Sequence, residues 1–195
     1  MTPRIRTWAI TGAIAAVAAA IAAAVILPQL EGDPIAELGR GDYELATTSG
    51  ESFTEDTLRG APSAVFFGFT HCPEVCPTTL GEVDGWKSVL SEEGRDLRVF
   101  FVTVDPERDT LEVLGDYVSW VPGVTGVSGS PDEVAEAIRA FRIYAAKVPL
   151  EDGGYTMDHS ASVLLFDAKG RLSGVIPYQA EDERALSAIR ELYSS

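Results

Sequence analysis

The stretch FFGFTHCPEVCP, residues 66–77, changes from apolar to polar and contains two cysteines, Cys72 and Cys76. Residues 63–69 are almost continuously apolar and of strand length, which is typical of a strand covered on both faces. A helix is expected from about Pro77 to Leu90, because proline is tolerated in a first helical turn. The stretch therefore predicts a buried strand that leads through a tight loop into a helix, with Cys72 and Cys76 at the helix start.

The rest of the chain alternates strand-like and helix-like segments. The expected elements are a short hairpin at 43–54, a second buried strand at 97–104, helices at 110–118 and 131–144, a long polar loop at 147–160, a hairpin of strands 162–167 and 171–177, and a closing helix at 181–193. This order predicts an α/β fold, a thioredoxin-like mixed sheet with flanking helices.

The start of the chain predicts one transmembrane helix before the domain. Residues 8–27 are uncharged and apolar, and about 20 such residues span the hydrocarbon core of a bilayer. A cleaved signal is the alternative, because Ala22 and Ala24 fit an A-x-A cleavage pattern, but the run exceeds the usual signal core. We therefore expect an anchor at 1–27, a linker at 28–41 and the folded domain at 42–195.

The charges around this segment predict where the domain lies. Arg4 and Arg6 should stay in the cytoplasm, which sends the domain outward. A chain without asparagine and with far more arginine than lysine indicates a bacterial source. We expect a single-pass protein of the bacterial cytoplasmic membrane with its C-terminal domain on the periplasmic side.

The charge balance excludes one class of partner. The chain has 15 Lys and Arg against 30 Asp and Glu, a formal net charge of −15. So acidic a protein repels phosphate backbones, and no nucleic-acid partner is expected.

The spacing of the cysteine pair indicates its chemistry. Two cysteines are too few for a disulfide framework, so we interpret the C-x3-C pair as a site. A helix N-terminus favours thiolate over thiol, and side chains at i and i+4 fall on one helical face. Disulfide exchangers usually carry C-x2-C. The longer spacing suits two thiolates on a soft metal, Cu(I) or Zn(II), and an added imidazole suits both oxidation states of copper.

The chain has two histidines from which a third ligand can come. His71 adjoins Cys72 and is expected to point away and to make local hydrogen bonds. His159 lies in a polar loop just before a buried strand, the region that a thioredoxin-like fold brings against the helix start, and it is the better candidate. Asp158 is a candidate outer-shell acid, whereas Met157 is expected to fill the core rather than to offer its thioether.

At these residues the chain resembles the Sco/SenC family of copper proteins. The resemblance rests on the cysteine block at 68–77, VDPERDT at 104–110, GVTG at 123–126 and Asp-His-Ser at 158–160, and it covers about residues 40–193. The family has a thioredoxin fold and one N-terminal membrane anchor, and it serves cytochrome c oxidase assembly. The resemblance implies that Cys72, Cys76 and His159 bind copper, as Cu(I) and Cu(II).

By the same resemblance the chain is a metallochaperone that delivers copper to the CuA centre of cytochrome c oxidase subunit II. A copper-donor protein and a thiol reductant are the further partners expected. Members of the family differ between copper delivery and reduction of the CuA-site cysteines, and no motif here separates the two roles.

Two enzyme hypotheses compete with copper binding. A thiol–disulfide oxidoreductase acting on the CuA-site cysteines or other exported disulfides would use Cys72 and Cys76 catalytically, so whether the chain is an enzyme stays open. A thiol peroxidase fits worse, since its reactive cysteine normally lacks a partner four residues on. Thioredoxins place a proline before the strand that faces the active site, whereas this chain has none between Leu150 and Pro177. We favour copper, with zinc as the alternative metal.

Overall fold

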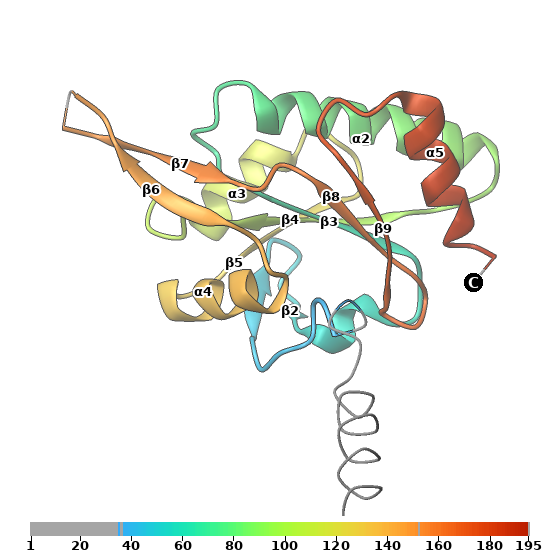
Figure 1. Ribbon diagram of the computed structural model, residues 1–195, viewed down its shortest axis with the longest axis horizontal. Coiled ribbons are helices and arrows are strands. Elements are labelled where there is room, and N and C mark those ends of the chain that lie inside the picture. Colours follow the sequence, from blue (N-terminus) through green and yellow to red (C-terminus); the bar gives the residue numbers. More distant parts are fainter. Residues whose placement is uncertain (1–34, 36, 152, 195) are drawn as a thin grey trace, which may run out of the picture. The chain divides into compact units, whose positions relative to one another are not determined.

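The computed structural model describes residue 35, residues 37–151 and residues 153–194. A compact unit, Leu38–Ser195, is built on a seven-stranded sheet with the strand order β2-β1-β5-β4-β3-β8-β9. Helices α2 and α5 lie on one side of this sheet and α4 on the other (Figure 1). The strands are β1 (Leu45–Thr47), β2 (Ser52–Phe53), β3 (Ser63–Gly68), β4 (Arg98–Thr103), β5 (Val124–Ser128), β8 (Val163–Phe166) and β9 (Leu172–Ile176). This mixed α/β architecture confirms the expected fold class.

Strand β3 is the centre of the molecule. All six of its residues are buried, as the apolar run predicts. It pairs in parallel with β4 and antiparallel with β8. The carboxyl ends of β3 and β4 therefore lie at one edge of the sheet, where the cysteine loop begins.

The helices lie close to the predicted ranges. They are α2 (Val75–Glu92), α3 (Leu111–Val118), α4 (Pro131–Ala140) and α5 (Asp182–Glu191), with the 3-10 helix η1 (Glu55–Leu58) after the first hairpin. A capping box starts α4, in which the Ser130 side chain accepts from the Glu133 N–H and Glu133 bonds back to the Ser130 N–H. Local capping thus determines where this helix begins.

Aromatic side chains fill the core on both faces of the sheet. On one face, Phe66 lies against Phe101 at 5.5 Å between ring centroids, and Phe101 contacts Tyr117 of α3 at 5.6 Å. On the other, Phe141, directly after α4, lies 5.1 Å from Phe67. The side chains of adjacent β3 residues therefore pack on opposite faces of the sheet, as the alternation of a strand requires.

Strand β5 was not expected. It pairs with β4 in parallel and with β1 in antiparallel fashion, inside the sheet. Its sequence, VTGVS, contains a glycine and two hydroxyl residues and gives little strand pattern. A Cβ on Gly126 would lie 2.9 Å from the Thr48 side chain and 3.1 Å from that of Leu114. Gly126 thus lets neighbouring segments approach closely, which explains a glycine inside a central strand.

The prediction of a long polar loop at 147–160 is wrong. Strands β6 (Ala145–Pro149) and β7 (Tyr155–His159) form an antiparallel hairpin, a second sheet of its own. Its side chains are half-buried or exposed, so the apolar alternation that identifies a strand is absent. The preceding helix also ends at Ala140 rather than Tyr144, because the backbone turns left-handed at Arg142, with φ of 52°.

The predicted membrane anchor at 1–27 and most of the linker at 28–41 lie outside the described residues. Within the part that the structure describes, no helix combines the length and the apolar character needed to cross a bilayer.

Candidate metal centre

Three side chains meet where the cysteine loop faces the β6–β7 hairpin. The sulfurs of Cys72 and Cys76 and a ring nitrogen of His159 all lie within 4.8 Å of one another. The Cys76 Sγ is 3.9 Å from His159 Nε2. Both cysteines are buried and free, and His159 is half-buried. The structure therefore brings together the three residues proposed as metal ligands from the sequence.

The cysteine loop folds back on itself at the start of α2. The Cys72 N–H donates to the Phe69 carbonyl at 3.2 Å, which makes a tight turn after β3. Cys76 lies in the first turn of α2, and its N–H donates to the Cys72 Sγ at 3.4 Å. Cys72 precedes the helix, so the two sulfurs meet through this turn and not, as expected, along one helical face.

Gly68 at the end of β3 makes room for the buried sulfur. A Cβ built there would lie 2.8 Å from the Cys76 Sγ and 2.7 Å from the Phe101 ring. Only a residue without a side chain lets the strand end this close to the thiol.

Burial determines the acidity of the deeper cysteine. It raises the pKa of the Cys76 thiol above its ordinary value, against a smaller lowering by the Phe69 backbone, and the adjacent Cys72 raises it further. Burial of Cys76 therefore acts against the thiolate form that a helix N-terminus was expected to favour. A metal that binds here must displace this proton, which couples binding to pH.

His159 is the last residue of β7 and not part of a loop. Its Nδ1 lies 2.9 Å from the Ser160 carbonyl. Because a carbonyl only accepts, Nδ1 carries the proton and the Nε2 lone pair faces Cys76. The Phe69 ring stands edge-to-face to the imidazole, with 5.7 Å between the ring centroids. The imidazole is thus held in the tautomer that a metal ligand needs.

His71 and Met157 take the minor roles expected of them, and Asp158 does not take the outer-shell role considered for it. His71 is exposed, with Nδ1 3.1 Å from the hydroxyl of Thr70, as expected for a local loop residue. Met157 packs against the core. Asp158 is exposed, so the Ser160 carbonyl, and not this acid, orients the imidazole.

Tyr117 is a residue near the thiols that the sequence did not indicate. Its hydroxyl is buried and has no hydrogen-bond partner among the described residues. Burial is the main cause of the raised pKa of Tyr117, and the two thiols and Asp109 raise this pKa further. Tyr117 lies in the last turn of α3, where the apolar pattern of the helix predicts only a core contact.

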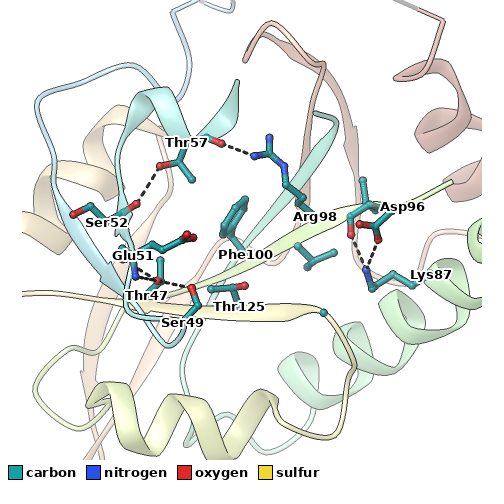
Figure 2. Close-up of a pocket in the computed structure, with 13 residues that line it drawn as sticks. Thr47, Ser49, Glu51, Ser52, Thr57, Lys87, Asp96, Arg98, Phe100 and Thr125 are labelled. Atoms are coloured by element: carbon teal, nitrogen blue, oxygen red, sulfur yellow. Dashed lines mark hydrogen bonds and ion pairs between the residues drawn. The ribbon is translucent and has the colours of Figure 1, made fainter. Parts of the chain in front are cut away.

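A cavity at the other end of the sheet has a different character. It has a volume of about 220 Å³ and opens near Arg98 and Thr125, where the parallel strands β4 and β5 begin. Figure 2 shows its hydroxyl and charged side chains, including Thr47, Ser49 and Lys87. Such hard oxygen and nitrogen groups do not suit a soft metal. The thiol–imidazole group is therefore the stronger candidate site.

The donor set is that of a soft or borderline metal. Two thiolates and one imidazole suit Cu(I) and Zn(II), and the nitrogen extends the set to Cu(II). Within the described residues, no other group of three or more Cys, His, Asp or Glu side chains converges in this way. The residues present thus fit a copper ion.

Known proteins resemble the chain over nearly all of the described region. The sequence profile of the SCO1/SenC family matches residues 33–194. An SCO2-like protein of Rickettsia prowazekii, RP587, is 37% identical over 134 residues, which cover 67% of this chain and 65% of the relative. The match therefore spans just under two thirds of that relative's length.

Solved structures agree in fold and in sequence. Copper-bound ScoI of Bradyrhizobium japonicum is 38% identical with a TM-score of 0.71, covering 80% of this chain and 99% of that one. Copper-bound yeast Sco1 is 33% identical with a TM-score of 0.74, covering 82% and 90%. The fold, the profile match and these relatives together show that the chain belongs to the SCO1/SenC family.

Proposed function

We propose that the chain is a membrane-anchored copper chaperone that delivers copper to the CuA centre of cytochrome c oxidase subunit II. Proteins of this family are linked to copper binding and to cytochrome oxidase assembly. The convergence of Cys72, Cys76 and His159 within 4.8 Å carries the proposal for this chain.

The thiolates and the imidazole favour different oxidation states of copper. Two thiolates hold Cu(I) in low coordination, and the imidazole adds the nitrogen that the harder Cu(II) favours. Burial raises the pKa of the Cys76 thiol, so copper that binds here displaces this proton. The Ser160 carbonyl holds the Nδ1 proton of His159, so that Nε2 is free to bind.

The rest of the proposal concerns location and partners. Residues 1–27 anchor the domain in the bacterial cytoplasmic membrane, and the domain faces the periplasm. Oxidase subunit II receives the metal, another protein donates it, and a thiol reductant keeps Cys72 and Cys76 reduced, because a disulfide would remove both thiolates.

A thiol–disulfide oxidoreductase is the second candidate. The contact between the Cys76 N–H and the Cys72 Sγ favours it, because it holds the two sulfurs near each other. An exchanger of this kind has no need of an imidazole beside the pair, whereas a metal site does. The two functions therefore differ in what they require of His159.

Replacement of His159 tests the copper site. In the reduced full chain, we expect His159→Ala to weaken Cu(II) by more than about 100-fold, because outer-shell changes alone typically cost about 10- to 100-fold in metal affinity. Cu(I) affinity should fall much less, since both thiolates remain. Competition titrations with each ion, together with the thiolate-to-copper charge-transfer band, measure these changes. A zinc site would give no such band.

His71→Ala is the matched control, since this histidine is exposed and bonds locally. It should keep the wild-type Cu(II) spectrum and affinity. If His71→Ala loses the band while His159→Ala keeps it, the ligand assignment is wrong. If both variants support oxidase assembly equally well in cells at limiting copper, thiol reduction replaces copper delivery as the function.

A further inference from the structure

We propose that the segment 105–110, between β4 and α3, positions both halves of the metal centre and thereby sets the distance between the cysteine pair and His159. The inference rests on the proposed copper site and deepens it. It assigns a role to residues that lie outside the ligand set.

The segment is itself a tightly held turn. The Arg108 and Asp109 N–H groups both donate to the Asp105 carbonyl, at 3.2 and 3.0 Å. The Asp105 N–H donates to Thr103 Oγ1 at 2.8 Å, and the Ser128 hydroxyl donates to the Asp109 carbonyl at 2.9 Å. These bonds fix the turn to β4 and β5, the core of the sheet.

One end of the segment holds the cysteine loop. Asp109 is fully buried, and its carboxylate accepts from the Thr70 N–H at 3.0 Å and from the Thr70 hydroxyl at 2.6 Å. The hydroxyl of Thr103 donates to the same carboxylate at 2.7 Å. Hydrogen bonds to a buried carboxylate are strong. Thr70 comes two residues before Cys72, so Asp109 determines where the loop leaves β3.

The other end holds the hairpin that carries His159. The Tyr155 hydroxyl donates to Asp105 Oδ1 at 2.8 Å, and Arg108 forms an ion pair with the other oxygen of that carboxylate. Arg108 also donates to the Tyr155 carbonyl at 3.1 Å and stacks over its ring at 3.9 Å. Lys147 of β6 completes the contact through an ion pair with Glu107 at 2.6 Å.

These contacts matter because the hairpin is a sheet of its own. A two-stranded hairpin is marginally stable by itself in water. Tyr155 begins β7 and His159 ends it, four residues along one extended strand. A shift at Tyr155 is therefore transmitted along β7 to the imidazole, about 13 Å away.

Removal of the Tyr155 hydroxyl tests the hairpin side. In the full chain, Tyr155→Phe keeps the ring and loses the bond to Asp105. We expect Cu(II) affinity to fall about tenfold and the charge-transfer band to shift, as for other outer-shell changes. Cu(I) affinity should stay within about twofold, because both thiolates are untouched. Tyr193→Phe is the control, since that hydroxyl donates to the Asp96 carbonyl at 2.7 Å, outside the metal centre.

Removal of the Thr70 hydroxyl tests the cysteine side. Thr70→Val keeps the shape and loses the 2.6 Å bond to Asp109. Because the cysteine loop serves both oxidation states, affinities for Cu(I) and Cu(II) should fall together, by about tenfold. Arg108→Lys is a second hairpin variant, which keeps the charge but loses the planar fork, and it should behave as Tyr155→Phe does.

A metal-free measurement separates this inference from the proposed function. Amide hydrogen exchange in β7 of the apo protein should speed up in Tyr155→Phe and not in Tyr193→Phe. If the wild type takes up no copper, the proposed function fails, and faster β7 exchange still supports the positioning role. If Tyr155→Phe and Arg108→Lys match the wild type in Cu(II) spectrum and in β7 exchange, the positioning role is wrong.

Discussion

At the scale of single residues, the metal centre depends on small groups as much as on its ligands. Gly68 lets β3 end beside the Cys76 sulfur. The Ser160 carbonyl determines which nitrogen of His159 is free. The sequence predicted which three side chains converge, Cys72, Cys76 and His159, because their residue types and the C-x3-C spacing carry the chemistry of a soft-metal site. It did not predict these supporting contacts. A local sequence pattern shows neither which group a backbone carbonyl will bind nor that a glycine will lie against a thiol.

Gly68→Ala should disturb the site and the core together. Its Cβ would lie 2.8 Å from the Cys76 Sγ and 2.7 Å from the Phe101 ring. Overpacking a core typically costs about 1–3 kcal/mol, so the urea midpoint should fall and the copper charge-transfer band should change. Gly85→Ala on α2 is the control, because a Cβ there meets nothing within 4 Å. It should be neutral or stabilising, by up to about 1 kcal/mol. Equal effects of the two substitutions would contradict the packing explanation.

At the scale of elements, prediction succeeded where one local pattern dominates. The fully buried β3 and the capped α4 lie close to the expected positions. It failed for β5, whose glycine is required by the neighbours Thr48 and Leu114, and for the half-exposed hairpin β6–β7. In both cases long-range pairing, and not local pattern, makes the strand.

The capping box of α4 gives the test at this scale. Ser130→Ala removes the side chain that accepts from the Glu133 N–H, and such a loss costs about 1 kcal/mol. Urea unfolding followed by circular dichroism measures the change. Ser119→Ala, at the exposed end of α3, is the control and should stay within about 0.5 kcal/mol of the wild type. A similar loss in both variants would show that the capping box is not the cause.

At the scale of the whole molecule, the sheet brings distant segments to one edge. Cys76 and His159 are 83 residues apart in sequence, yet the antiparallel pairing of β3 with β8 places the end of the hairpin beside the start of α2. Element order was enough to predict a mixed sheet and the approach of His159 to the cysteines. It was not enough to predict the strand order, because the missed β5 lies between β1 and β4.

An ion pair joins the C-terminal ends of α2 and α5, which lie on the same side of the sheet. It should make the stability of the fold depend on pH. Arg190 of α5 donates to the Glu93 carboxylate at 2.6 Å, at the C-terminal end of α2. This bond lowers the pKa of Glu93 in the folded protein, with Arg95 contributing as well. A carboxyl group whose pKa is lower when folded stabilises the fold above its unfolded pKa, about 4.3, and loses that contribution as the pH falls.

Between pH 7 and pH 3, the urea midpoint of the wild type should therefore fall more steeply than that of Glu93→Gln. Glu92→Gln, the adjacent residue of α2, should follow the wild type. The difference between wild type and Glu93→Gln should shrink in 1 M salt, because exposed charges are screened there. If Glu93→Gln and the wild type fall in parallel at low salt, this ion pair does not link α2 to α5 energetically.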